Sequence, residues 1–237
     1  MLKNITVYHY KPAEVWGKAV DFLVNRIRLN HNMSIKTLIL LSGGSAVNLY
    51  RDLGAFIEKN DLDPKFLTFA QVDERYQPES GRDINANNIK ETGLWKICDE
   101  KKISYHLISQ RESFTDSIDG YNAILESLFR MTYKLAVLGV GADGHTAGLL
   151  PGSEKKWNKK LFVTGYENNG EYKKRISVTP KTIGLLDQVF VVANGVEKKE
   201  ALTNLVKGKK KGKWDEFPAG IIALVPNINL FTDQRII

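Results

Sequence analysis

Residues 135–152, which read LAVLGVGADGHTAGLLPG, decide the expected fold of this chain. The first four form an apolar run, which is typical of a strand buried on both faces of a parallel sheet. Five glycines follow within fourteen residues, and glycine permits close approaches and backbone conformations that strain other residues. A strand that runs into such a loop predicts an α/β fold, with the loop at the carboxyl end of the strand, where ligands bind.

Asp143 and His145 stand two residues apart inside this loop, and the other three histidines lie outside it. An imidazole titrates near physiological pH and suits a general base. We therefore expect His145 to be catalytic and Asp143 to orient its ring or help build the loop. The alternative is that the glycines only form a tight turn between a strand and a helix.

Gly139, Gly141 and Gly144 also match the pattern G-x-G-x-x-G of dinucleotide-binding loops. That function requires a long helix directly after the third glycine. Pro151 and Gly152 limit such a helix to a turn or two, because proline cannot continue it. The match is weak evidence for a dinucleotide, and we expect no cofactor.

A second loop follows the apolar run 37–41 and reads Ser42-Gly43-Gly44-Ser45, ahead of a helical pattern over 46–58. Backbone N–H groups at the start of a helix bind anions, and glycines let a phosphate come close. The loop lacks the lysine of a Walker motif and the second glycine of a nucleophile elbow. It therefore indicates either a phosphate site or a plain helix start capped by Ser45.

A third loop follows the predicted strand 66–72 and begins Asp73-Glu74-Arg75. Adjacent carboxylates on a strand point to opposite faces, so they are not a facing acid/base pair. Arg75 is expected to stabilise an oxyanion or hold a phosphate, unless it forms a surface salt bridge. Because all three loops follow strands, we expect residues 42–45, 73–75 and 139–148 to share one cleft.

The whole chain has 237 residues, 43% of them hydrophobic, which suits one α/β domain over residues 1–237 with a mainly parallel sheet covered on both faces. The expected strands are 5–10, 37–41, 66–72, 103–108, 135–138, 161–166, 172–178, 188–193 and 221–225; 161–166 and 172–178 form a hairpin. The expected helices are 13–27, with Pro12 at the first helical position, 46–58, 85–94, 112–131 and one that starts within 195–202.

Composition sets further expectations. The single cysteine, Cys98, has no partner for a disulfide or a zinc site. No apolar run approaches the ~18 residues of a membrane span, and no secretory signal is visible, so we expect a cytoplasmic protein. The net charge of +7 includes five lysines within 207–213. Without interleaved aromatic residues, this run indicates a solvated loop rather than a nucleic-acid site.

The loop 139–152 resembles the signature Gly-x-Gly-x-Asp-Gly-His-Thr-Ala-Ser-Leu-Phe-Pro-Gly of the 6-phosphogluconolactonase family. The sequence departs from that signature at Gly148, where serine is usual, and at Leu150, where phenylalanine is usual. Glucosamine-6-phosphate deaminases, which belong to the same larger group, share Asp-Gly-His but continue with Asn-Glu-Pro. The run Leu149-Leu150-Pro151 favours the lactonases.

The resemblance implies a three-layer α/β/α fold like that of the glucosamine-6-phosphate deaminases and ribose-5-phosphate isomerases. It also implies roles for single residues. Asn85 matches the family's Asp-Ser-Asn-Tyr, from which Ile84 and Ala86 depart; the alternative is a helix N-cap. Arg175 and Lys198 match two phosphate-binding cations of the family; the alternative is solvated cations. The residues expected to bind substrate or phosphate are Gly43, Gly44, Ser45, Asp73, Asn85, Gly141, Gly144, Arg175 and Lys198, and those expected to be catalytic are His145, Asp143 and Arg75.

The activity that the resemblance implies is hydrolysis of 6-phospho-D-glucono-1,5-lactone to 6-phospho-D-gluconate, a step of the oxidative pentose phosphate pathway. His145 would activate the water, without a metal. We expect a sugar-phosphate lactone as the small-molecule partner, no nucleic acid or membrane, and a monomer or weak homodimer. The alternatives are a deaminase or isomerase of the glucosamine-6-phosphate type and a non-catalytic sugar-phosphate sensor.

Overall fold

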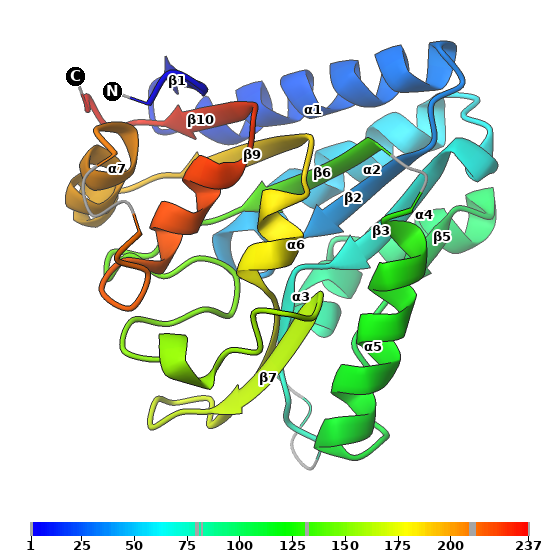
Figure 1. Cartoon of the computed structure of the whole chain (residues 1–237). Helices are drawn as coiled ribbons and strands as arrows, with labels where there is room; N and C mark the ends of the chain where they lie inside the picture. Colours follow the sequence, from blue (N-terminus) through cyan, green and yellow to red (C-terminus); the bar gives the residue numbers. More distant parts are fainter. Residues whose placement is uncertain (1, 79–80, 82, 131–132, 209–211, 237) are drawn as a thin grey trace.

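The computed structural model describes residues 2–78, 81, 83–130, 133–208 and 212–236. Its centre is a seven-stranded sheet in which every neighbouring pair is parallel, with the order β1-β10-β9-β6-β2-β3-β5 (Figure 1). The strands are β1 (Ile5–His9), β2 (Thr37–Leu41), β3 (Leu67–Gln71), β5 (Ser104–His106), β6 (Tyr133–Leu138), β9 (Gln188–Ala193) and β10 (Ile228–Thr232). The expected parallel α/β sheet is confirmed.

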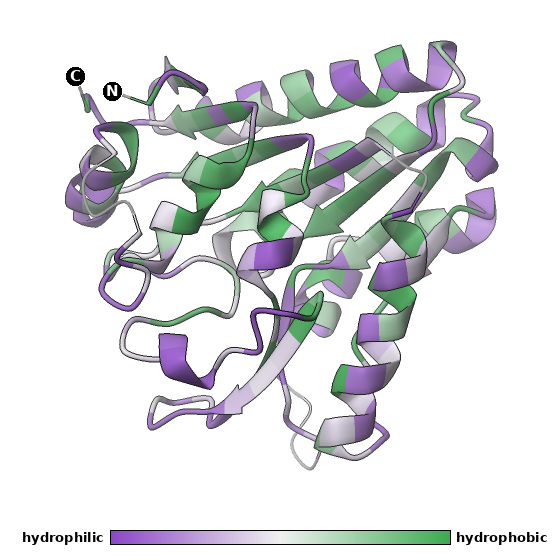
Figure 2. Ribbon diagram, viewed as in Figure 1, coloured by the Kyte–Doolittle hydropathy of each residue, from purple (hydrophilic) through white to green (hydrophobic). Residues whose placement is uncertain are grey.

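Helices cover both faces of this sheet, because alternate residues of its strands pack in opposite directions. Leu38 and Leu40 of β2 belong to one apolar cluster, and Ile39 and Leu41 belong to the other. Helices α1 (Val15–Asn32), α2 (Tyr50–Lys59) and α4 (Leu94–Lys101) pack in the second cluster; α5 (Phe114–Leu128), α6 (Pro180–Gly184), α7 (Lys199–Val206) and the 3-10 helix η5 (Pro218–Leu224) pack in the first. Hydrophobic strands between helices with polar outer faces give the expected three layers (Figure 2).

A small antiparallel sheet lies beyond the carboxyl ends of the main strands. It has the order β4 (Asp73–Arg75), β8 (Lys174–Val178), β7 (Val163–Glu167), and β7 and β8 form the predicted hairpin. The register sets Asp73 opposite Ser177 and Arg75 opposite Arg175. Two motifs far apart in the sequence therefore become neighbours.

Several predicted elements differ from the structure. The strand expected at 221–225 is wrong: the segment belongs to the 3-10 helix η5, and the last strand is β10. A short apolar run cannot separate a strand from a buried helical turn, and Pro218 starts this one as a helix. The helix expected over 85–94 is two helices, α3 (Asn85–Glu91) and α4, since Gly93 takes φ +86° between them. Pro12 lies in a turn, and α1 begins at Val15.

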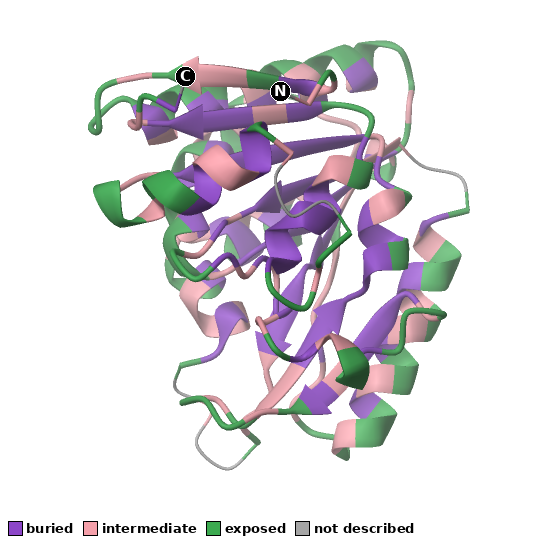
Figure 3. Ribbon diagram, turned by 60° about the vertical axis from the view of Figure 1, so that its left-hand side comes forward, coloured by how far each residue is buried: buried purple, intermediate pink, exposed green. Residues whose placement is uncertain are grey.

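Shorter 3-10 turns complete the chain: η1 (Gly44–Leu49), η2 (Pro64–Phe66), η3 (Glu154–Lys156) and η4 (Val196–Lys198). The helix expected over 46–58 therefore starts as the 3-10 turn η1 and continues as α2. Burial is concentrated in the strands and in the inner faces of the helices (Figure 3). In the described part of the chain, no helix is both long and apolar enough to cross a membrane.

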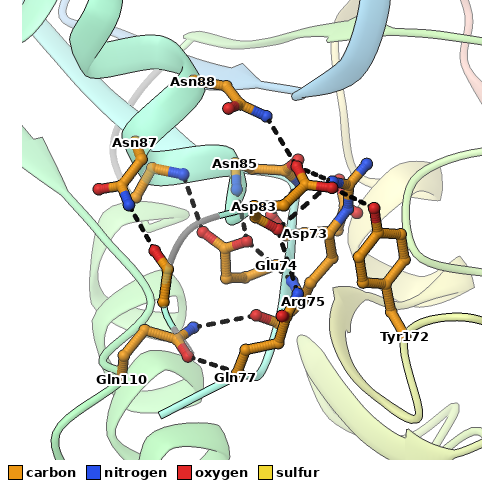
Figure 4. Close-up of polar contacts among 12 residues, drawn as sticks. Asp73, Glu74, Arg75, Gln77, Asp83, Asn85, Asn87, Asn88, Gln110 and Tyr172 are labelled. Atoms are coloured by element: carbon orange, nitrogen blue, oxygen red, sulfur yellow. Dashed lines mark hydrogen bonds and ion pairs between the residues drawn. The ribbon is translucent and has the colours of Figure 1, made fainter. Parts of the chain in front are cut away.

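Glu74 joins the small sheet to α3 through a fully buried carboxylate (Figure 4). Its oxygens accept hydrogen bonds from the backbone N–H groups of Arg75 (2.8 Å), Asn85 (2.7 Å) and Ala86 (2.9 Å), and from the side-chain amide of Gln71 (2.9 Å). Burial raises the pKa of Glu74, and these hydrogen bonds oppose the rise. The carboxylate thus takes the place of an N-cap for α3.

Replacing Glu74 with alanine should lower the free energy of unfolding by about 3 kcal/mol, because buried N–H donors lose their acceptor. Urea denaturation followed by circular dichroism measures the change. Glu91→Ala, at an exposed position of the same helix, is the control and should stay within about 0.5 kcal/mol of the parent. Equal stabilities of the Glu74 and Glu91 variants would contradict the capping role.

Candidate active site

One cleft of about 470 Å³ lies where the loops after β2, β3, β6 and β9 meet the small sheet. The three loops predicted to converge, 42–45, 73–75 and 139–148, all contribute to it. The residues that line it are Ser42, Gly43, Gly44, Ser45, Asp73, Arg75, Asn85, Gly139, Val140, Gly141, Ala142, His145, Ala147, Arg175 and Lys198. Asp143 and Gly144, also predicted as site residues, do not line it, although Asp143 contacts the lining residue His145.

Asp143 holds the ring of His145 in one orientation. Its Oδ1 lies 2.6 Å from His145 Nδ1 and also accepts the backbone N–H of His145 at 3.0 Å. The hydrogen bond from the imidazole lowers the pKa of Asp143, so its carboxylate is ionised at neutral pH and Nδ1 carries the proton. The other ring nitrogen, Nε2, has no hydrogen-bond partner among the described residues, and the side chain is 41% exposed. Nε2 is therefore the basic nitrogen available to a ligand.

The glycines of this loop make room for that pair. A Cβ at Gly141 would lie 2.2 Å from Nδ1 of His145 and 2.5 Å from Oδ1 of Asp143. Gly144 takes φ +86°, and a Cβ there would lie 2.4 Å from the ring of Phe217. Residues 139–152 contain no helix, so the short helix that the sequence allowed after Gly144 is absent, as is the long one of a dinucleotide site.

The Gly-Gly-Ser loop lines the cleft beside Asn85. A Cβ at Gly43 would fall 1.9 Å from Oδ1 of Asn85, so only glycine fits beside that side chain, and Gly44 takes φ +59°. No side chain caps η1, which contradicts the alternative that Ser45 is a plain N-cap. Ser45 is exposed at the cleft, and the first N–H groups of such a turn have no partner within it.

Three cations and one buried carboxylate set the charge of the cleft. Arg75, Arg175 and Lys198 line it together with Asp73. Burial raises the pKa of Asp73, and the nearby charges of Arg175, Arg75 and His145 oppose the rise. Arg75 pairs with Asp83, but its side chain is only 19% exposed, so the pair is not a simple surface salt bridge. The cations therefore outnumber the anions that face the cleft.

Asn85 does not act as the N-cap that was the alternative for it. It is the first residue of α3, after Ile84. Its side-chain amide donates to the backbone carbonyl of Asp73 at 3.0 Å and lines the cleft.

The cleft as a whole combines an oriented imidazole, a glycine-rich loop and converging cations. Such an arrangement can bind an anionic ligand and move a proton beside it.

The sequence profile of the family described as glucosamine-6-phosphate isomerases/6-phosphogluconolactonase matches residues 11–228. The chain belongs to this family. A 6-phosphogluconolactonase of Borreliella burgdorferi is 31% identical over 232 residues, which cover 91% of this chain and 93% of that protein. A glucosamine-6-phosphate deaminase of Alkaliphilus metalliredigens is 24% identical over 231 residues, covering 92% and 91%. The resemblance inferred from the motifs is confirmed.

A solved structure gives the same fold. The 6-phosphogluconolactonase from Thermotoga maritima superimposes with a TM-score of 0.74 at 23% identity, covering 96% of this chain and 99% of that one.

The departure from the family signature at Gly148 has a local reason in this chain. A Cβ at Gly148 would lie 3.0 Å from Cβ of Ser177 and 3.2 Å from Cβ of Asp73, which is tighter than most side-chain contacts.

Three residues that hold lining residues of the cleft in place were not predicted from the sequence: Glu74, Asp83 and Tyr172. Glu74 and Asp83 lie inside matched motifs, but nothing in their spacing indicated their partners. Tyr172 lies in a hairpin loop and gave no signal. The lysine run at 207–213 includes residues 209–211, which lie outside the described residues, so its interpretation as a solvated loop stays a prediction.

Gly141→Ala should break the contact between Asp143 and His145, because the added methyl group needs the space of the imidazole. The ¹⁵N chemical shifts of the His145 ring should then lose the preference for a proton on Nδ1. Gly139→Ala is the matched control in the same loop, since a Cβ there meets no atom within 4 Å. Identical ring shifts in the Gly141 variant and the parent would contradict the packing argument.

Proposed function

We propose that this chain hydrolyses 6-phospho-D-glucono-1,5-lactone to 6-phospho-D-gluconate, with His145 activating the attacking water. The observation that carries the proposal is one cleft that contains an Asp143-oriented imidazole and the cations Arg75, Arg175 and Lys198. The relative from Borreliella burgdorferi, a 6-phosphogluconolactonase that this chain matches over most of its length, supports the same activity.

In this mechanism, Nε2 of His145 takes a proton from water as the water oxygen attacks C1 of the lactone. The tetrahedral intermediate carries negative charge on the former carbonyl oxygen, which backbone N–H groups of the cleft stabilise. The bond between C1 and the ring oxygen then breaks. His145 returns its proton to the ring oxygen, which becomes a hydroxyl group. The lactone is an activated ester, so the proposal needs neither a metal nor a covalent intermediate.

Binding is assigned to the other side chains of the cleft. Gly43, Gly44 and Ser45 offer backbone N–H groups to the phosphate. Arg75, Arg175 and Lys198 compensate its charge. Asp73 and Asn85 are placed to accept or donate hydrogen bonds to the sugar. A phosphate bound in this way fixes the distance between C1 and His145, which lowers the entropic part of the activation barrier for hydrolysis.

A glucosamine-6-phosphate deaminase is the second candidate, because one of the matched relatives carries that name. The two activities differ in product, since only the deaminase releases ammonia from glucosamine 6-phosphate.

We further propose a cytoplasmic protein, a monomer or weak homodimer, without nucleic-acid or membrane partners. The single cysteine and the local origin of the positive charge support these points.

His145→Ala should reduce turnover of the lactone by 10²–10⁴-fold, the usual contribution of a general base. Acid release from fresh lactone is followed against the spontaneous reaction. Calorimetry should show that 6-phosphogluconate still binds, because the phosphate contacts remain. His9→Ala, an exposed histidine at the far edge strand β1, is the control. Unchanged turnover in the His145 variant would refute the general-base role.

Incubation with EDTA followed by gel filtration should leave the rate of lactone hydrolysis unchanged, because the proposed proton transfers use only protein groups and water. The same acid-release assay measures it. A loss of activity that added Mg²⁺ or Zn²⁺ restores would contradict the mechanism, whereas ammonia release from glucosamine 6-phosphate would favour the deaminase.

A further inference from the structure

Tyr172 lies behind two arginines of the cleft without lining the cleft itself. It belongs to the loop of the β7–β8 hairpin. Its ring centroid is 4.1 Å from Cζ of Arg75 and 5.4 Å from Cζ of Arg175. A guanidinium over an aromatic face at these distances is attracted by the ring. One side chain outside the cleft lining therefore contacts both arginines.

The two arginines need such a partner because of the sheet register. Arg75 of β4 and Arg175 of β8 are directly opposite residues in an antiparallel pair. Like charges in that position repel and weaken the pairing. Two guanidinium groups held side by side nevertheless match a phosphate dianion, which offers several acceptor oxygens. The two guanidinium groups therefore repel each other when no anion is bound, and both can pair with a phosphate when one is bound.

Asp83 connects Tyr172 to Arg75 by hydrogen bonds (Figure 4). The Tyr172 hydroxyl donates to Oδ2 of Asp83, while Nη1 of Arg75 pairs with Oδ1 and also donates to the Asp83 backbone carbonyl at 3.3 Å. The hydrogen bond from Tyr172 lowers the pKa of Asp83, so this carboxylate stays charged. Tyr172 thus occupies Oδ2 of Asp83 and leaves Oδ1 to Arg75, which fixes the orientation of the Arg75 guanidinium.

Arg175 depends on Tyr172 more strongly. No hydrogen bond or ion pair holds its guanidinium in the described part of the chain, and its Nε is buried without a partner. The buried carboxylate of Asp73 attracts the guanidinium, which also interacts electrostatically with Tyr166. The Tyr172 ring is the aromatic face that Arg175 shares with Arg75.

We propose that Tyr172 is a positioning residue, which holds the guanidinium groups of Arg75 and Arg175 side by side so that both bind the phosphate of the substrate. The inference rests on the proposed function and extends it. Tyr172 itself touches neither the phosphate nor the reacting atoms. Its effect is on affinity for the phosphorylated ligand and on the preference for a phosphorylated over an unphosphorylated lactone.

Two variants separate the two interactions. Tyr172→Phe keeps the ring and loses the hydrogen bond to Asp83, and Tyr172→Leu loses both. Calorimetry with 6-phosphogluconate should give a dissociation constant raised about threefold in Tyr172→Phe, the scale of one hydrogen bond. Tyr172→Leu should raise it about tenfold, since two cation–π contacts are lost as well. KM for the lactone should rise in the same order, with kcat within about threefold of the parent.

Tyr133→Leu is the matched control. The Tyr133 ring also lies near an arginine, with its centroid 5.7 Å from Cζ of Arg26, and its hydroxyl lies 3.1 Å from Oε1 of Gln188. It stands at the amino end of β6, opposite the end that carries the cleft. Its loss should leave the affinity for 6-phosphogluconate unchanged. Thermal unfolding of both leucine variants shows whether stability alone explains a difference.

The ratio of kcat/KM for 6-phosphogluconolactone to that for glucono-1,5-lactone should fall about tenfold in Tyr172→Leu. A dissociation constant equal to that of the parent, or a loss confined to kcat, would overturn the positioning role. The outcome is distinguishable from failure of the proposed function. If His145→Ala hydrolyses the lactone normally while Tyr172→Leu binds 6-phosphogluconate weakly, the mechanism fails and the positioning role stands.

Discussion

The pairing of β4 with β8 is the constraint on which the cleft depends. Side chains alternate across a strand, so a slip of one residue in this register would turn Asp73 and Arg75 away from the ligand and present Glu74 instead. The buried carboxylate of Glu74 opposes that slip, because its four hydrogen bonds to β3, β4 and α3 fix the face of β4 on which it lies. A group with no contact to the ligand thus decides which charges face the ligand.

Close packing without Cβ atoms shapes the same cleft. Gly43 leaves room for Asn85, and Gly141 leaves room for His145. Gly148 goes further, since its N–H donates to Oγ of the buried Ser177 at 3.0 Å. Serine is usual at position 148 in the resembled family. Glycine leaves no Cβ at this position to crowd the Cβ atoms of Ser177 and Asp73.

Much of the fold followed from apolar runs and the loops after them, because parallel strands place their carboxyl ends at one edge. The convergence of Gly44, Arg75 and His145 was predictable on that ground. The strand expected at 221–225 failed because a buried 3-10 turn has the same apolar content. Tyr172 was unpredictable for a different reason. Its partners are set by the register of β4 with β8 and by the path of the loop inside the predicted hairpin, and the sequence pattern that predicted the hairpin fixes neither.

The electrostatics explain why the cleft needs carboxylates among its cations. Arg75 and Arg175 would repel each other and turn towards solvent if nothing opposed their charge. Asp83 orients Arg75 from outside the cleft, and Asp73 attracts both arginines from its buried position. Because burial raises the pKa of Asp73, its charge is the more easily lost of the two as the pH falls. Protonation of Asp73 would leave Arg75 and Arg175 with a greater excess of positive charge and a stronger mutual repulsion. The ionised carboxylate therefore helps to keep the two arginines in the cleft.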